Sequence, residues 1–385
     1  MRATARCRVD LAGGTLDIWP LGLLHRSACT VNLAVDLPVT VEMARREAGW
    51  AYESELGSGS VHEREALAVE PETALLGLVA EELDLPPVAV RWRSGSPRGA
   101  GLGASSALTV ALLAAGSRLL GREAEEPVRL AARARDLEAR LMGLPTGLQD
   151  HLPALLGGAL ALHHEPGGVR IQRLAVDLER LEAALHLFYT GVSHFSAGNN
   201  WRIVRARLDA DPAVTARLER IARAAEALAR ALEAGELEEV GRLAGEEWLA
   251  RRELAPGIST PEIEAILAAT AAAGAWGEGL RCRRGRLRRG AGARRAPRRR
   301  RGGGPHGGRI APRRPSGAVR ARVGGRRLAR HARGPLTPMA GERAPALALG
   351  RSSTPPQVAG FVHNSPPSPT GRHRRAALDP IGGSG

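Results

Sequence analysis

Lysine is absent from this 385-residue sequence, and aromatic residues make up only 3% of it. All 55 of its Lys/Arg side chains are therefore arginine, which, with the abundant alanine and glycine, indicates a GC-rich coding sequence rather than a functional demand. The three cysteines, Cys7, Cys29 and Cys282, are an odd number without metal-ligand spacing. They argue against a disulfide framework and favour the cytoplasm. No uncharged apolar run reaches the roughly 18 residues of a membrane span, and charged residues interrupt the N-terminal stretch, so we expect neither a span nor a signal peptide.

Acidic residues are almost missing from the last part of the chain. Residues 278–385 contain 26 arginines against three acidic residues, a net charge of +23, and half of the 26 prolines. Residues 1–277 contain 29 arginines against 37 acidic residues, a net charge of −8. The last segment shows no sustained strand or helix period, so it cannot bury enough apolar area to fold. The sequence therefore predicts a folded, mildly acidic body and a disordered basic tail.

A glycine-rich turn is the most informative feature of the body. Its sequence, PRGAGLGASSAL at 97–108, follows an expected strand at 88–92 and opens an expected helix at 105–120. Glycines let the backbone approach a ligand, and a helix start presents unpaired N–H groups and a positive dipole end. The turn therefore predicts a phosphate cradle. It lacks the Gly-Lys-Ser/Thr ending of a Walker loop, and a small-residue helix start packed under a sheet is the alternative.

Two further segments accompany this turn: RVDLAGGTLD at 8–17 and EARLMGLPTGLQD at 138–150. In order and spacing the three segments resemble the GHMP small-molecule kinases, a family that includes galactokinase, homoserine kinase and mevalonate kinase. The similarity is greatest to the heptose-7-phosphate kinase and fucokinase branch, which YTGVS at 189–193 and LAPGISTPEI at 254–263 also resemble. The resemblance covers about residues 1–277 and then stops.

Strands and helices that mix without strict βαβ alternation favour an α+β fold. The resemblance implies the two-domain GHMP kinase fold, with an N-terminal ATP-binding domain at 1–180 and an incomplete, truncated C-terminal domain at 181–277. The disordered Arg/Gly/Pro-rich tail at 278–385 follows. Hydrophobic periodicity and breaker residues predict short strands at 30–35 and 39–42, a buried strand at 185–191, helices at 71–85 and 123–142, three amphipathic helices within 202–252, and a helix opened by Pro261.

The resemblance also implies a role for individual residues. Asp150 faces the acceptor hydroxyl as general base or charge stabiliser, and Arg8 orients this carboxylate and keeps it ionised. Asp17 accepts hydrogen bonds from sugar hydroxyls, and Ser105 and Glu138 bind Mg²⁺. The ATP phosphates lie against Gly99, Gly101, Leu102, Gly103, Ala104, Ser105 and Ser106.

Each assignment has a plainer alternative. Asp150 and Asp17 would then cap turns, while Arg8 and Glu138 would be solvated surface charges. His151 stands where the family commonly carries glutamine, and it receives no role. The sequence thus predicts an ATP- and Mg²⁺-dependent cytoplasmic kinase that phosphorylates a hydroxyl of a small-molecule sugar or sugar phosphate.

The basic tail leaves three interpretations open. One back-translation of residues 277–289, with a single guanine removed, encodes Gly-Lys-Gly-Cys-Gly-Ala-Gly-Gly-Gly-Gly-Cys-Val, which resembles the third glycine-rich motif of the family. The tail is then out of frame from about Glu278. On this view the chain is either the kinase or a catalytically defective product that lacks this motif. The third interpretation is a nucleic-acid-binding protein that acts, non-specifically, through the arginine-rich tail.

Overall fold

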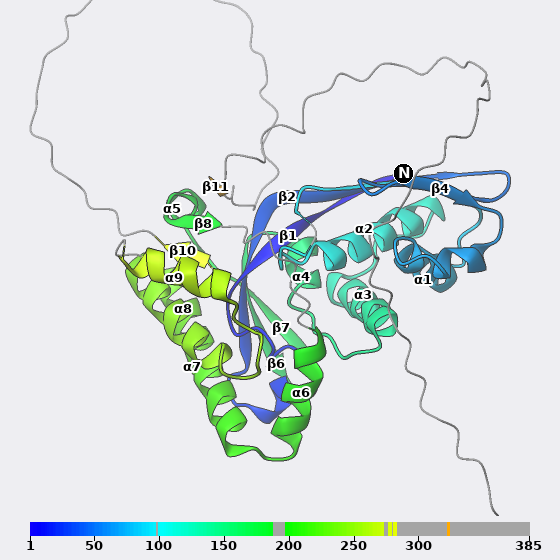
Figure 1. Ribbon diagram of the computed structural model, residues 1–385. Coiled ribbons are helices and arrows are strands. Elements are labelled where there is room, and N and C mark those ends of the chain that lie inside the picture. Colours follow the sequence, from blue (N-terminus) through cyan, green and yellow to red (C-terminus); the bar gives the residue numbers. More distant parts are fainter. Residues whose placement is uncertain (98, 188–196, 273–275, 279, 283–321, 324–385) are drawn as a thin grey trace, which may run out of the picture. The chain divides into compact units, whose positions relative to one another are not determined.

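The computed structural model describes residues 1–97, 99–187, 197–272, 276–278, 280–282 and 322–323, and it has the mixed α+β fold that the sequence predicts (Figure 1). The strands are β1 (Arg2–Ala12), β2 (Cys29–Arg45), β3 (Trp50–Glu53), β4 (Ser58–Val61), β5 (Val88–Ser94), β6 (Ala159–Glu165), β7 (Gly168–Arg173), β8 (Leu185–Leu187), β9 (Trp276–Glu278), β10 (Leu280–Cys282) and β11 (Arg322–Val323). The helices are α1 (Ala74–Leu83), α2 (Ala104–Leu119), α3 (Pro127–Met142), α4 (His151–Leu156), α5 (Leu178–Ala184), α6 (Ala197–Leu208), α7 (Pro212–Ala234), α8 (Leu237–Arg251) and α9 (Pro261–Ala272), with short 3₁₀ turns η1 (Leu21–Leu24) and η2 (Arg64–Ala68).

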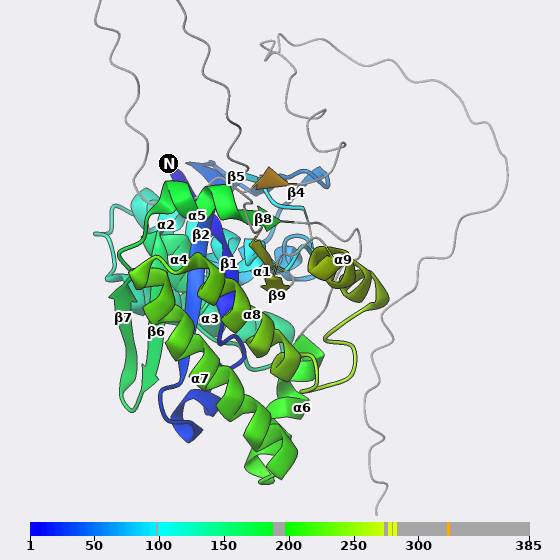
Figure 2. The same ribbon diagram turned by 90° about the vertical axis from the view of Figure 1, so that its left-hand side faces the viewer.

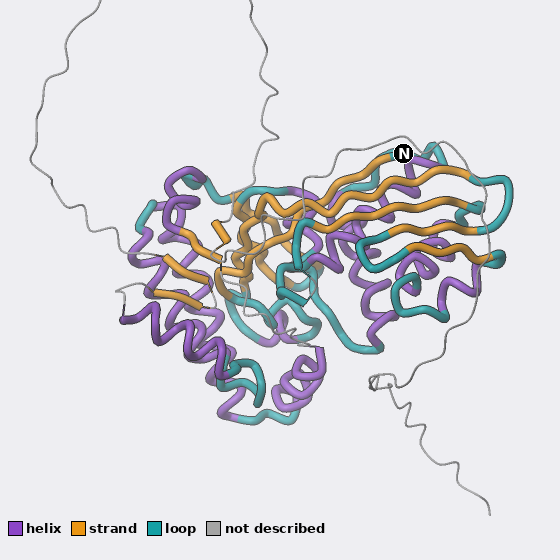
Figure 3. The backbone as a smooth tube through the Cα atoms, turned by 45° about the horizontal axis from the view of Figure 1, so that its top comes forward, coloured by secondary structure: helices purple, strands orange, loops and turns teal. Residues whose placement is uncertain are grey.

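The long strand β2 organises a seven-stranded sheet, in which it pairs antiparallel with β1, β5 and β6. Figure 3 shows these long strands side by side. Residues 29–35 of β2 are all buried, whereas from Val39 to Ala44 the more buried and the more exposed residues alternate. A strand buried on both faces needs cover on both sides, and an alternating strand needs it on one side. The first half of β2 therefore lies in the interior, and the site described below is built beside it.

Helices α1, α2 and α3 lie together beside the long strands (Figure 1). Helix α2 follows β5 directly and packs against both β1 and β2 with small apolar residues such as Ala107, Ala111 and Ala115. Helices α7 and α8 pack side by side and also contact β1 (Figure 2). Many of the buried residues of these helices and of the sheet belong to one large hydrophobic cluster.

A second hydrophobic cluster anchors the segment that follows β1. Leu16, Ile18 and Leu21 are nearly inaccessible to solvent, and they pack with buried residues of α6, α7 and the end of α8, such as Ile203 and Leu218. Because the segment between β1 and β2 is held by these helices, residues near the N-terminus and residues beyond position 200 share one packed region.

The helices and strands predicted from the sequence are confirmed in outline, and the bounds of several of them are corrected. Helices α6, α7 and α8 fill the stretch expected to hold three amphipathic helices, and α9 begins at Pro261 as expected. The two short strands expected at 30–35 and 39–42 are wrong, because β2 runs unbroken through Asp36 and Pro38. A register shift between Arg6 and Arg8 of β1, opposite Pro38, accommodates the proline. The helix expected at 123–142 begins only at Pro127, with the Glu126 carboxylate capping it.

Parts of the predictions fall outside the described residues. Of the strand expected at 185–191, only Leu185–Leu187 is described, and the segment 189–193 is not. Within 278–385, the structure describes Glu278, Leu280–Cys282 and Arg322–Val323 as strand residues, which form a four-stranded sheet in the order β11–β8–β10–β9. Among the helices that the structure describes, none is both long and apolar enough to span a membrane.

Candidate active site

The predicted phosphate cradle lies between β5 and α2, where the sequence places it. Helix α2 begins at Ala104, and its N-cap residue Gly103 has a φ of +67°, a left-handed conformation that favours glycine. A glycine N-cap brings no side-chain oxygen, so the first-turn N–H groups of α2 are left to other acceptors. A Cβ at Gly101 would meet no atom within 4 Å, so the turn is open beside this residue. The arrangement suits an anion at the start of α2.

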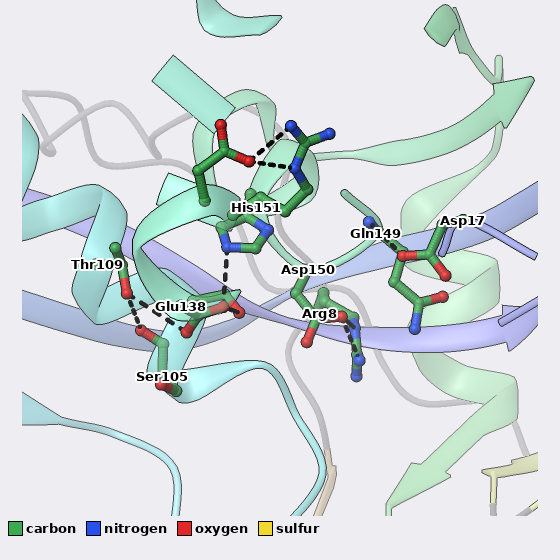
Figure 4. A network of polar contacts seen from close by, with 11 residues as sticks. Arg8, Asp17, Ser105, Thr109, Glu138, Gln149, Asp150 and His151 are labelled. Carbon is green, nitrogen blue, oxygen red and sulfur yellow. Dashed lines mark hydrogen bonds and ion pairs between the residues drawn. The ribbon is translucent and has the colours of Figure 1, made fainter. Parts of the chain in front are cut away.

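Arg8 joins this turn to Asp150. Its Nε and Nη2 atoms donate to Asp150 Oδ1 at 2.9 and 2.5 Å, and its Nη1 donates to the carbonyl of Gly101 at 2.6 Å (Figure 4). The backbone N–H of Arg8 donates to the Leu102 carbonyl at 2.9 Å. The Arg8 side chain is 8% exposed and the Asp150 side chain 27%, so the pair is partly withdrawn from water. Such a charge-assisted pair fixes both groups and holds Asp150 at the edge of the glycine-rich turn.

The plainer alternatives for Asp150 and Arg8, a turn cap and a solvated surface charge, do not agree with the geometry. Asp150 occupies the N-cap position of α4, but its side chain makes no capping hydrogen bond. Arg8 is buried rather than a solvated surface charge. Gly103 lies next to both, since a Cβ there would sit 3.4 Å from Arg8 Cγ and 3.5 Å from Asp150 Cβ. The cradle and the carboxylate are therefore immediate neighbours.

Asp17 lies on the other side of this pair. It stands between the buried anchors Leu16 and Ile18, and its Oδ2 accepts the backbone N–H of Gln149 at 3.1 Å. A Cβ at Gly147 would collide with the Asp17 carboxylate, so the close approach requires glycine. The pKa of Asp17 is raised to about 7, mainly by burial; the charges of Asp150 and Asp10 add to this rise and the hydrogen bond from Gln149 opposes it.

Several buried oxygen atoms on this side have no hydrogen-bond partner among the described residues. They are Asp17 Oδ1, Gln149 Oε1 and Asn32 Oδ1. An unpaired buried acceptor is costly, and a ligand that donates hydrogen bonds would satisfy it. Figure 4 shows Asp17 and Gln149 close together, with Arg8 and Asp150 beside them. Among the described residues, the side of the site next to Asp17 therefore has several buried acceptors that are left without a donor.

A further network of buried charged and polar residues, which the sequence does not predict, surrounds the turn that leads to Asp17. Asp10, two residues after Arg8 on β1, accepts a hydrogen bond from Asn32 Nδ2 on β2, and burial raises its pKa to about 6. Glu247 of α8 is fully buried, accepts the N–H of Gly13 at 3.1 Å, and pairs with Arg251. A Cβ at Gly14 would touch both Arg251 and Asp10, so the guanidinium lies over this turn. Helix α8 thus holds the turn that leads to Asp17.

Glu138 and the serines of α2 meet at the opposite end of the cradle. Ser106 Oγ donates to Glu138 Oε2 at 2.7 Å, Thr109 Oγ1 lies 3.4 Å from Oε1, and Ser105 also reaches this carboxylate. Burial raises the pKa of Glu138, but the close His151 ring and the hydrogen bonds from the two serines outweigh burial and leave the pKa below its usual value. The alternative of a solvated glutamate is wrong, since Glu138 is 4% exposed.

The donor set around Glu138 fits Mg²⁺. A carboxylate and hydroxyl groups at the edge of a phosphate cradle are the hard oxygen ligands this ion prefers, and it commonly takes one or two ligands from protein. Glu138 and Ser105, the ligands that the sequence predicts, lie together here with the buried Ser106. No group of three or more His, Cys, Asp or Glu side chains suited to a metal occurs in the described part of the chain.

The structure thus brings all of the predicted site residues to one turn and its surroundings. Gly99, Gly101, Leu102, Gly103, Ala104, Ser105 and Ser106 form the turn and the start of α2, with Arg8 and Asp150 against it. Asp17 lies on one side and Glu138 on the other. A separate hollow bordered by Arg2, Glu42 and Tyr52 contains none of these residues.

Parts of this chain are similar in sequence to known kinases. Residues 70–158 match the model of the GHMP kinases N terminal domain. The chain is 26% identical over 285 residues to the bifunctional fucokinase/GDP-fucose pyrophosphorylase of Arabidopsis thaliana, covering 67% of this chain and 26% of that protein. It is 32% identical over 165 residues to the mevalonate kinase of Methanothermobacter thermautotrophicus, covering 42% of this chain and 50% of that protein. The chain therefore spans half or less of the length of these curated relatives.

A solved structure shares the fold. The D-glycero-D-manno-heptose 1-phosphate kinase from Bacteriodes thetaiotaomicron matches with a TM-score of 0.56 at 20% identity, over 73% of this chain and 86% of that one. The match to the GHMP kinases N terminal domain thus extends over residues 70–158, and the described part of the chain shares the mixed α+β fold of this solved kinase.

Proposed function

We propose that this chain, whose residues 70–158 match the GHMP kinases N terminal domain, transfers the γ-phosphate of ATP to a hydroxyl group of a sugar. The observation that carries the proposal is the position of Arg8, which contacts Asp150 and the carbonyl of Gly101 at once. Phosphoryl transfer requires an acceptor hydroxyl held in line with the phosphate that it attacks. Asp150 stands at the border between the cradle and the acceptor-rich side, where such a hydroxyl would lie.

Each part of the site then has a task. The N–H groups at the start of α2 and the turn 99–103 bind the ATP phosphates. Asp150 accepts the proton of the attacking hydroxyl or stabilises charge as the new oxygen–phosphorus bond forms and ADP leaves with the electrons of the broken bond. Arg8 holds Asp150 in place and ties it to the turn. Ser105, Ser106 and Glu138 would hold Mg²⁺, which neutralises charge on the phosphates when bound.

The unpaired oxygen atoms support a polyhydroxylated acceptor. Asp17 Oδ1 and Gln149 Oε1 are buried acceptors, and sugar hydroxyls are donors that would satisfy both. Two guanidinium groups near these acceptors, those of Arg8 and Arg251, are already held by Asp150 and Glu247. The described residues therefore favour an uncharged sugar over a sugar phosphate as the acceptor.

The direct test is ADP release from ATP and Mg²⁺ with a panel of free sugars and the matching sugar phosphates. We expect turnover with one or a few free sugars in the protein whose frame is restored near codon 277, and loss of that turnover when Asp150→Asn is introduced there. Turnover with sugar phosphates alone would contradict the uncharged acceptor. Failure of every sugar, with ATP binding intact, would point to a catalytically defective product.

The proposal also covers how the chain divides into domains and in which cellular compartment it acts. Residues 1–180 would form the ATP-binding domain and 181–277 an incomplete C-terminal domain, with 278–385 out of frame. Because α8 reaches back to Gly13, the acceptor side would need residues of both domains. ATP as the donor, and the free thiols of Cys7 and Cys29, favour the cytoplasm.

A further inference from the structure

We propose that His151 is a positioning residue that fixes the Glu138 carboxylate for Mg²⁺ through its Nε2 atom. The inference rests on the proposed phosphotransfer function and goes beyond it, because no role follows for His151 from the sequence. His151 is the first residue of α4 and is fully buried. Its Nε2 lies 2.9 Å from Glu138 Oε2, and the two side chains are 0% and 6% exposed. Figure 4 shows the ring directed at this carboxylate.

The two oxygen atoms of Glu138 are held unequally. Oε2 lies near two donors, Ser106 Oγ at 2.7 Å and His151 Nε2 at 2.9 Å. Oε1 has a longer contact, 3.4 Å from Thr109 Oγ1, and Ser105, which we assign to the same ion, also reaches this carboxylate. A carboxylate anchored through one oxygen keeps acceptor capacity on the other, and Oε1 is the atom we assign to the ion. His151 therefore leaves the ligating oxygen free while it sets the plane of the group.

Burying the polar ring of His151 costs free energy, and this cost calls for a role of the ring in the site. Neither ring nitrogen of His151 completes a well-aligned hydrogen bond with the residues that the structure describes, and Nε2 has its 2.9 Å ion-pair contact with Glu138 Oε2. Burying an imidazole nitrogen unpaired costs free energy, which an apolar side chain of similar size would avoid. The stability of the core therefore does not account for the polar ring, whose short contact with a charged group is the one to Glu138.

His151 also connects the two ends of the site, because it directly follows Asp150 in the sequence. Asp150 contacts Arg8, and the next residue contacts Glu138. Helix α4 packs against α2, α3 and β1, which carry Ser106, Glu138 and Arg8. One short segment thus sets the distance between the acceptor carboxylate and the carboxylate assigned to Mg²⁺.

The test compares two amide substitutions in the full-length chain. In His151→Gln the amide nitrogen can reach the position of Nε2, whereas in His151→Asn it falls near the position of Nδ1. We would measure ADP affinity by calorimetry with and without Mg²⁺. Partners of metal ligands typically contribute about 10- to 100-fold in metal affinity. We expect His151→Asn to lose about tenfold of the Mg²⁺-dependent gain in ADP affinity, and His151→Gln to stay within about threefold of wild type.

The control is His163→Leu, which removes a ring bonded to Gln172 on the β6–β7 hairpin. It should leave the Mg²⁺-dependent gain unchanged. Equal behaviour of the two His151 variants would overturn the inference, as would a loss that is the same with and without Mg²⁺, since a merely structural role would produce either. Wild-type protein that binds ADP without any Mg²⁺ effect would refute the metal site, and wild-type protein that does not bind ADP would refute the proposed function.

Discussion

Replacing Asp17 with asparagine tests two effects of this carboxylate separately. One is its unfavourable contribution to the stability of the fold, and the other is its role in the proposed reaction. Burial raises the pKa of Asp17 from 3.8 to about 7. The folded chain therefore keeps a proton on Asp17 up to about pH 7, whereas the unfolded chain loses it near pH 3.8. Raising the pH between these two values favours the unfolded chain, and above them the penalty stays constant.

The size of the effect follows from this shift. One pKa unit corresponds to about 1.4 kcal/mol, so going from pH 5 to pH 8 would cost the wild-type chain at most about 3 kcal/mol through Asp17. The side chain retains some contact with water, and we reduce this figure to about 1–2 kcal/mol. Asparagine has a similar shape and no proton to lose. The Tm of Asp17→Asn relative to wild type should therefore rise by about 2–6 °C between pH 5 and pH 8.

The assay is thermal unfolding followed by circular dichroism at both pH values, with Asp209→Asn as the matched control. Asp209 is an exposed aspartate between α6 and α7 that pairs with Arg205, so its replacement should leave the Tm difference between the two pH values unchanged.

In kinetics, Asp17→Asn should raise the KM for the sugar by about tenfold or more, because a charged acceptor is lost. Wild-type kcat/KM for the sugar should rise with pH toward about 7, and the variant should lose that step. A Tm difference that does not depend on pH would refute the reasoning.

Three other perturbations probe the rest of the site. Asp150→Asn should lower kcat by about 10²- to 10⁴-fold with ADP affinity within about twofold, and full turnover would remove its catalytic assignment. Gly103→Arg puts a large side chain at a φ of +67° in the cradle, so nucleotide binding measured by calorimetry should vanish while far-UV dichroism is retained. Unchanged ATP affinity in that variant would contradict the cradle. Deleting one base near codon 277, to restore the glycine-rich motif, should turn a poorly soluble, nearly inactive product into a soluble kinase; robust sugar-kinase activity of the 385-residue chain itself would refute the frameshift.

Periodicity in the sequence located most of the long helices, and it failed to give the extent of the long strand β2. Helices α6 to α8 follow from apolar residues at helical spacing and from breakers such as Pro212 and Gly235. The strand β2 was divided wrongly because Asp36 and Pro38 are typical of a turn. Its continuity depends on the register shift in β1, which a single-strand pattern does not contain.

The site was predicted where a motif carries it and missed where it depends on distant contacts. The contact between Arg8 and Asp150 joins residues 142 positions apart, and only the family resemblance placed them together. Glu247 and Arg251 have the spacing of an ordinary solvated helix pair, so nothing in the sequence distinguishes the fully buried Glu247. Asn32 lies within an apolar run, and its hydrogen bond to Asp10 becomes evident only from the pairing of β1 with β2.

The hydrogen bond from Gly13 to Glu247 has a consequence for the order in which the chain folds during synthesis. The nucleotide side of the site uses residues up to Glu138 and His151, so it can assemble once α4 has left the ribosome. The turn before Asp17 must wait for α8, since its partner lies 234 residues further along. At about 5–20 residues per second, the emergence of that partner lags by several seconds. A nascent chain would therefore acquire nucleotide binding before it could bind a sugar, and chains released before residue 251 should bind ADP but not the acceptor.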